Sequence, residues 1–104
     1  MAEVEERIAR IRTHKGVKGL LIVDDKRKVH RSTMGNPKTD PETRMYSQKV
    51  TDLAIKARNV VRDLDPLNDM VFFRVRSKKE EIMVAPDKNL LVIVRQVIGD
   101  ENEG

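Results

Sequence analysis

The sequence predicts an α/β fold of the α+β sandwich type. In it, a five-stranded antiparallel sheet carries one long helix on one face and a short N-terminal helix on the other. Apolar residues recur at helical spacing through residues 40–66, which indicates one helix that is long for a 104-residue chain. Two uncharged apolar runs, 20–23 and 90–94, are typical of short strands buried on both faces. Strands that follow one another through short turns pair antiparallel.

The composition limits the classes of protein to consider. The length favours a single domain, placed at residues 1–98 and followed by an acidic flexible tail at 99–104. With no cysteine, the chain has neither disulfides nor thiolate sites. The charged start and the lack of a long apolar run argue against a secretion signal or membrane insertion, so we expect a cytoplasmic protein. The net charge of +4 is spread out and aromatic residues make up only 3%, which disfavours nucleic acid as a partner.

The first expected element is a short helix over residues 2–13. Val4, Ile8 and Ile11 follow the i, i+4, i+7 pattern, and Gly16 suits the left-handed residue that often follows a helix. A helix this short is marginal alone in water. We therefore expect it to dock on the sheet.

A hairpin should follow this helix. Residues 20–23 form its buried strand and residues 24–27 its turn, although the turn has no glycine. The return strand, residues 28–33, has Val29 as its one aliphatic β-branched residue and is otherwise mostly polar or charged. Such a strand is typical of a sheet edge.

The long helix has clear signals at both ends. Asp40 is a favourable N-cap, Pro41 suits the first helical position, and Pro66 disfavours helical geometry in the residue before it. One stripe should form its buried face: Tyr46, Val50, Leu53, Ala54, Ala57, Val60, Val61 and Leu64.

Three strands are expected after the helix, at residues 70–76, 80–85 and 90–94. In the first of them, alternation places Val71, Phe73 and Val75 on one face and Met70, Phe72, Arg74 and Arg76 on the other. The last strand is uncharged throughout, so it should lie in the middle of the sheet.

No arrangement of residues indicates catalysis, a cofactor or a metal ion. Gly16 and Gly19 do not form a phosphate-binding loop, and His14 and His30 stand in different elements without a second ligand at suitable spacing. We therefore expect no enzyme.

Two faces have the composition of an interface instead. A strand face that mixes methionine, phenylalanine and arginine is typical of protein contacts. The back of the long helix carries arginines around a single isoleucine, which would meet its copy in an antiparallel pairing. The predicted dimer-interface residues are Ile55, Arg58, Arg62, Met70, Phe72, Arg74 and Arg76.

Long strings of residues resemble one family, the roadblock-type dynein light chains. The strings are MAEVEE at 1–6, HKGV at 14–17, STM at 32–34, IKAR at 55–58, VRDLDP at 61–66, ND at 68–69, RVRSKK at 74–79 and EIMVAPDK at 81–88. The resemblance implies a non-catalytic, roadblock/longin-like domain. It implies a homodimer in which the strand after the long helix pairs with its copy, while the two long helices lie side by side.

The same resemblance implies the partners. The dimer would bind the dynein intermediate chain and help link the motor to cargo on microtubules, in the cytoplasm or in a cilium or flagellar axoneme. Pairing with a paralogue stays open, and so does a cargo adaptor as a further partner. The alternative is a roadblock-like scaffold or regulator of a small GTPase. The first hairpin departs from the family pattern at Arg27, Lys28 and His30, which leaves its contacts open.

Overall fold

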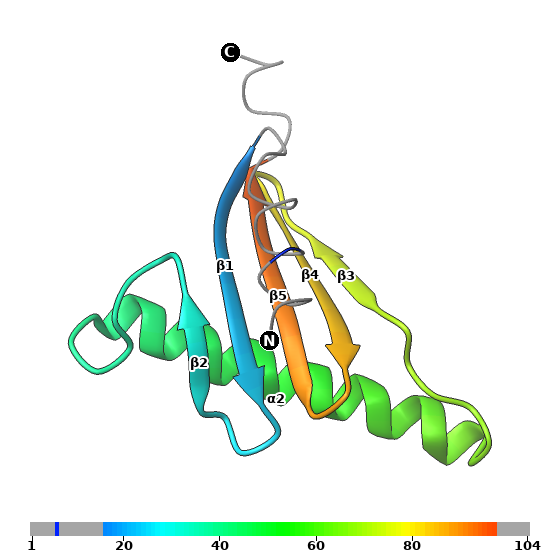
Figure 1. Cartoon of the computed structure of the whole chain (residues 1–104). Coiled ribbons are helices and arrows are strands. Elements are labelled where there is room, and N and C mark those ends of the chain that lie inside the picture. Colours follow the sequence, from blue (N-terminus) through cyan, green and yellow to red (C-terminus); the bar gives the residue numbers. More distant parts are fainter. Residues whose placement is uncertain (1–5, 7–15, 98–104) are drawn as a thin grey trace.

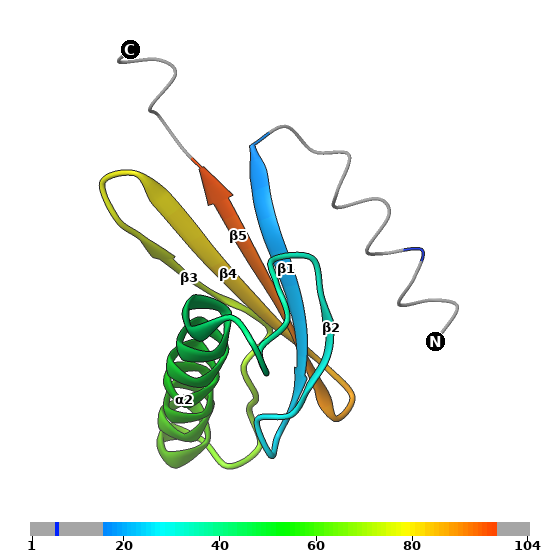
Figure 2. The ribbon, with the colours of Figure 1, turned by 90° about the vertical axis from the view of Figure 1, so that its left-hand side faces the viewer.

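The computed structural model describes residue 6 and residues 16–97. One long helix lies on one face of a five-stranded sheet (Figures 1 and 2). The sheet order is β2-β1-β5-β4-β3, and every neighbouring pair is antiparallel. The elements are β1 (Val17–Asp24), β2 (Val29–Ser32), α2 (Pro41–Leu64), β3 (Phe73–Arg76), β4 (Glu80–Asp87) and β5 (Leu90–Val97). The predicted sheet and long helix are confirmed. Apart from residue 6, the expected helix at 2–13 falls outside the described residues, and so does the tail at 99–104.

The two uncharged runs occupy the middle of the sheet, as predicted. Each central strand sends alternate side chains to opposite faces, so each supplies two separate clusters. Leu21, Val23 and Ile93 pack on the helix side with Val50 and Ala54 of α2. The opposite face has its own buried cluster: Leu20, Ile22, Val92 and Val94.

The ends of α2 are the predicted ones. The Asp40 carboxylate accepts hydrogen bonds from the Glu42 amide (3.3 Å) and from the Thr43 hydroxyl (2.6 Å). The Thr43 bond is the main reason why the pKa of Asp40 lies below its usual 3.8. The helix ends at Leu64, and the Asp65 amide donates to the Val61 carbonyl. The N-cap and Pro66 therefore define this helix as the sequence indicated.

The buried face of α2 differs from the predicted one. Small residues at i, i+4 and i+8 face the sheet: Thr43, Ser47 and Thr51, together with Val50 and Ala54. Small side chains let the helix backbone lie close to the sheet, which leaves no room under it for a wider apolar stripe. The prediction was wrong for Leu53, Val60 and Leu64, which are exposed.

The strand after the helix is shorter than predicted. β3 begins at Phe73, and Met70 is buried at 8% exposure before the strand starts. The predicted alternating face from Met70 to Arg76 was therefore wrong at its first residue.

The first turn shows how a hairpin forms without glycine. Arg27 takes a left-handed conformation (φ 70°), and the Asp24 carboxylate accepts from the amides of Lys26 (2.8 Å) and Lys28 (2.9 Å). His30 lies 2.9 Å from the same carboxylate. The Lys28 amide, the largest cause, and His30 lower the pKa of Asp24 to about 2.

Candidate interaction surface

The predicted strand residues lie at the free edge of the sheet. β3 is the terminal strand, so one side of its backbone has no strand neighbour within residues 16–97. Phe72 is 55% exposed, and the Arg74 guanidinium lies 5.9 Å from the centre of its ring. Arg74 also donates to the Met83 sulfur (3.3 Å), and Arg76 is exposed. The structure thus brings Phe72 and Arg74 together, leaves Arg76 exposed on the same strand as Arg74, and buries Met70.

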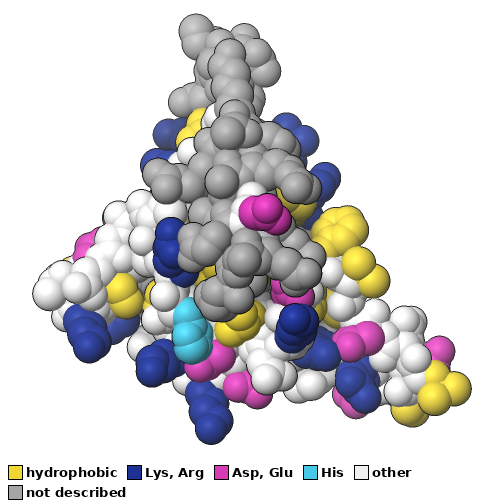
Figure 3. All heavy atoms as spheres, viewed as in Figure 1, with side chains coloured by type: hydrophobic (Ala, Val, Ile, Leu, Met, Phe, Trp, Pro, Cys, Tyr) yellow, Lys and Arg dark blue, Asp and Glu magenta, His cyan; other side chains and the backbone are white. Residues whose placement is uncertain are grey.

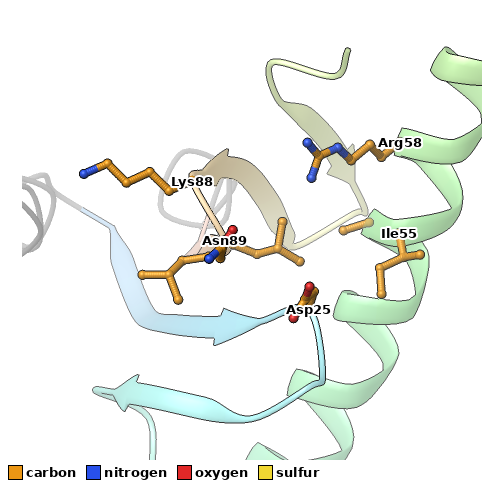
Figure 4. Close-up of a pocket in the computed structure, with 8 residues that line it drawn as sticks. Asp25, Ile55, Arg58, Lys88 and Asn89 are labelled. Carbon is orange, nitrogen blue, oxygen red and sulfur yellow. The ribbon is translucent and has the colours of Figure 1, made fainter. Parts of the chain in front are cut away.

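The predicted helix residues lie elsewhere. Ile55 and Arg58 line a cavity of about 150 Å³ together with Asp25 and two residues of the β4–β5 turn, Lys88 and Asn89 (Figure 4). The cavity lies where α2 passes the tips of two hairpins. Arg62 is exposed on the same helix. The role of these three side chains in a dimer stays a prediction.

Arg58 also ties the helix to the chain leading into β3. Its Nε and one terminal nitrogen donate to the two carboxylate oxygens of Asp69, each at 2.8 Å. This bidentate pair raises the pKa of Arg58 and lowers the pKa of Asp69. Both side chains are substantially exposed, so the pair orients the segment more than it stabilises the fold.

The long helix has an exposed apolar face, which contains Met45 and three residues predicted to be buried: Leu53, Val60 and Leu64. Its residues lie at positions i, i+8, i+15 and i+19, which fall on one side of a helix. We name them the helix stripe: Met45, Leu53, Val60 and Leu64. One feature of the sequence could have predicted this exposure. Thr43, Ser47 and Thr51 form a row of small residues along the helix, and such a row can face a sheet closely.

The helix stripe continues into an apolar groove. The groove has a volume of about 490 Å³, and almost all of its lining is apolar. Met45 and Tyr46 of α2 form one wall, and Ile82 of β4 lies in the other. Three further apolar residues are exposed in β3 and in the segment before it: Leu67, Val71 and Val75. Figure 3 shows hydrophobic side chains at the right-hand edge of the molecule, over β3 and the end of α2. An exposed apolar area of this kind is typical of a binding surface.

A charged network borders the same groove. The Glu80 carboxylate accepts from Arg95 at 2.8 and 3.0 Å and from the Lys18 amine at 3.2 Å. Arg95, the main cause, lowers the pKa of Glu80. The Arg95 guanidinium also lies 5.1 Å from the centre of the Tyr46 ring. The guanidinium thus packs over the ring that forms part of the groove wall.

The described residues contain no group of three or more histidine or acidic side chains placed to hold a metal ion. In the same part of the chain, no helix is both long and apolar enough to span a membrane. The arrangement offers a surface for protein contacts.

The comparisons with known proteins agree with this fold. A model of the Roadblock/LC7 domain matches residues 3–95. The chain is similar to the Roadblock/LC7 domain from Streptomyces avermitilis, with a TM-score of 0.72 and 9% identity over 84% of this chain and 71% of that one. It is also similar to MglB from Myxococcus xanthus, with a TM-score of 0.63 and 13% identity over 79% of this chain and 60% of that one. The family model spans nearly the whole chain, and the protein therefore belongs to the Roadblock/LC7 domain family.

Proposed function

We propose that the protein is a non-catalytic, homodimeric scaffold that holds a partner protein. The observation that carries this proposal is the exposed helix stripe, in a protomer whose β3 edge is also open. An unpaired strand edge invites pairing with another strand, and pairing with its own copy would close it. The resemblance to a family of homodimers supports the same arrangement.

The dimer would also bury apolar surface that the protomer leaves in water. Leu64 is 82% exposed, Val60 56% and Leu53 45%. Burial of apolar surface contributes about 25 cal/mol per Å², and specific interfaces commonly bury roughly 1,600 Å² in total. A chain with three aromatic residues in all gains a large share of its stability from such burial.

Substitutions on the two sides of α2 test which side forms the contact. Leu53→Lys and Phe72→Asp should give monomers in light scattering at micromolar concentration, because each places a charge in the proposed interface. Ile55→Lys is the matched control, since Ile55 lies on the other side of the same helix turn. A monomeric Ile55→Lys together with a dimeric Leu53→Lys would assign the helix contact to the side of Ile55, Arg58 and Arg62.

A small GTPase is one candidate partner, for which the protein would act as scaffold or regulator. The similar solved structures are bacterial, which supports a general scaffold role over one specific to a motor. The protein would contribute a rigid dimeric platform, and the chemistry would belong to the GTPase.

The dynein intermediate chain is the second candidate partner. It is supported by the strings of residues that resemble roadblock-type dynein light chains, notably RVRSKK at 74–79 and EIMVAPDK at 81–88. In this role the protein would act in the cytoplasm on microtubules, or in an axoneme, and would link a motor to cargo.

Affinity purification from the native cell separates the two roles. Co-purification of dynein heavy and intermediate chains, independent of added nucleotide, would support the motor role. Recovery of a GTPase that changes between GDP and a non-hydrolysable GTP analogue would support the regulatory role. The Phe72→Asp variant serves as control, because a partner that needs the dimer should be lost with it.

A further inference from the structure

A second groove lies at the opposite edge of the sheet from β3. It runs between β2 and the first half of α2, and its volume is about 250 Å³. Its floor includes Val29 of β2 and Ser47 of α2. We name it the β2 groove, and its lining residues are Arg27, Lys28, Val29, Pro37, Lys38, Arg44, Ser47 and Gln48.

The lining of the β2 groove has one sign of charge. Four of its residues are cationic and none is acidic. Arg27 is paired with Asp52 at 2.6 Å. Arg44 donates to the Pro37 carbonyl (3.4 Å), and its charge interacts with the Asp40 carboxylate. Among the described residues, the side chains of Lys28 and Lys38 form no salt bridge. Figure 3 shows lysine and arginine side chains gathered around β2 and its turn, at the lower left.

Protection of a sheet edge explains only part of this charge. Lysines on a terminal strand deter edge-to-edge aggregation, and Lys28 fits that role. Lys38 lies in the loop before α2, and Arg44 lies on the helix itself. Neither residue lies on a strand, so neither can protect a strand edge, yet both line the same groove as Lys28. Three separate segments therefore supply cations to one concave surface.

The backbone of β2 offers a second means of recognition. β2 is a four-residue terminal strand, so one side of its backbone has no neighbouring strand in the described chain. An extended peptide can add to such an edge through main-chain hydrogen bonds, while pockets beside the edge select its side chains.

We propose that the β2 groove binds an extended acidic segment of a partner protein. Main-chain pairing with β2 would align the segment, and one or two of its carboxylates would enter the groove among Lys28, Lys38 and Arg44. The exposed amide of Gln48 offers a further polar contact, whereas the buried Ser47 hydroxyl already donates to the Arg44 carbonyl (2.9 Å). This site lies apart from the proposed dimer surface, so each protomer of a dimer would carry one.

Fluorescence anisotropy with labelled hexaglutamate tests the proposal, with hexaglutamine as the uncharged control peptide. The double variant Lys38→Glu/Arg44→Glu should weaken hexaglutamate binding by about tenfold or more. Lys78→Glu/Lys79→Glu changes the net charge equally at the β3–β4 turn and should weaken binding by less than about threefold. Lys38→Gln/Arg44→Gln, which adds no negative charge, should still weaken binding by several-fold.

Several outcomes would overturn the proposal. Equal loss of affinity in the two charge-reversed variants would mean attraction by net charge alone. If hexaglutamate did not bind at low salt, the β2 groove would not be a binding site for acidic segments. The chain's own acidic residues, Asp100, Glu101 and Glu103, are the competing occupant. If neutralising all three tightened hexaglutamate binding about tenfold, the groove would belong to that tail. Light scattering reports the dimer separately, so failure here leaves the proposed scaffold intact.

Discussion

At the scale of single residues, Tyr46 packs against the core while its hydroxyl has no hydrogen-bond partner among the described residues. Burial raises the pKa of this hydroxyl to about 12. A buried polar group without a partner lowers stability. Tyr46→Phe should therefore leave the free energy of unfolding unchanged or raise it by up to about 1 kcal/mol in urea denaturation. A loss of more than about 1 kcal/mol would show that the hydroxyl has a partner, such as an ordered water.

The Glu80 carboxylate gives a second residue-scale prediction, in the dependence of stability on pH. Its bonds with Arg95 keep its pKa below the usual 4.5 in the folded protein. A depressed carboxyl pKa stabilises the fold above the unfolded pKa, and this stabilisation is lost as the pH falls through the folded value. Glu80→Gln should cost about 1 kcal/mol at neutral pH, after allowance for partial exposure.

The difference between the wild type and Glu80→Gln should shrink as the pH falls below 4.5, measured by urea denaturation at a series of pH values. Glu42→Gln is the control, because Glu42 lies 3.9 Å from Arg95 but its side chain is 73% exposed. Glu42→Gln should leave the free energy of unfolding nearly unchanged at every pH. A Glu80→Gln difference that stayed constant down to the acid range would assign the loss to packing instead.

At the scale of elements, the start of α2 depends on a glycine that the sequence presents only as part of a loop. A Cβ atom built on Gly35 would lie 2.6 Å from an Asp40 carboxylate oxygen and 2.9 Å from the Thr43 hydroxyl. Gly35→Ala should displace the N-cap carboxylate and lower the thermal midpoint by several degrees. In Asp40→Ala the same glycine substitution should have a smaller effect, because the cap is already lost. Equal effects in both backgrounds would contradict this coupling.

The same helix shows what its sequence could predict and what it could not. Asp40, Pro41 and Pro66 act through local backbone chemistry, so both ends of α2 were predictable. Its buried side was not predictable, because either Leu53 or Thr51 could face the sheet. Which of them does so depends on the distance between the helix and the sheet. Periodicity reports where apolar residues lie on a helix. It does not distinguish a side buried in the protomer from one available to a partner.

At the scale of the whole molecule, the candidate surface combines residues of α2 with residues in and next to β3. Alternation places Phe72, Arg74 and Arg76 on one face, and the family resemblance implies that their strand pairs with its copy, which fits the open edge of β3 in the structure. To predict which side of α2 is exposed, one must know how the helix is rotated about its axis, and this rotation depends on packing in three dimensions. Ile55 and Leu53 differ by two positions and lie on opposite sides of that helix.

If the fold gains stability from its own copy, the thermal midpoint must depend on protein concentration. Association that favours the folded state raises the midpoint with concentration by mass action. The wild type should therefore melt several degrees higher at about 100 µM than at about 1 µM. Leu53→Lys should melt lower and show no such dependence, whereas Ile55→Lys should keep it. The midpoint can be measured by calorimetry or circular dichroism. A wild-type midpoint that is constant over this range would mean that the helix stripe binds a different protein and not a second copy of the chain.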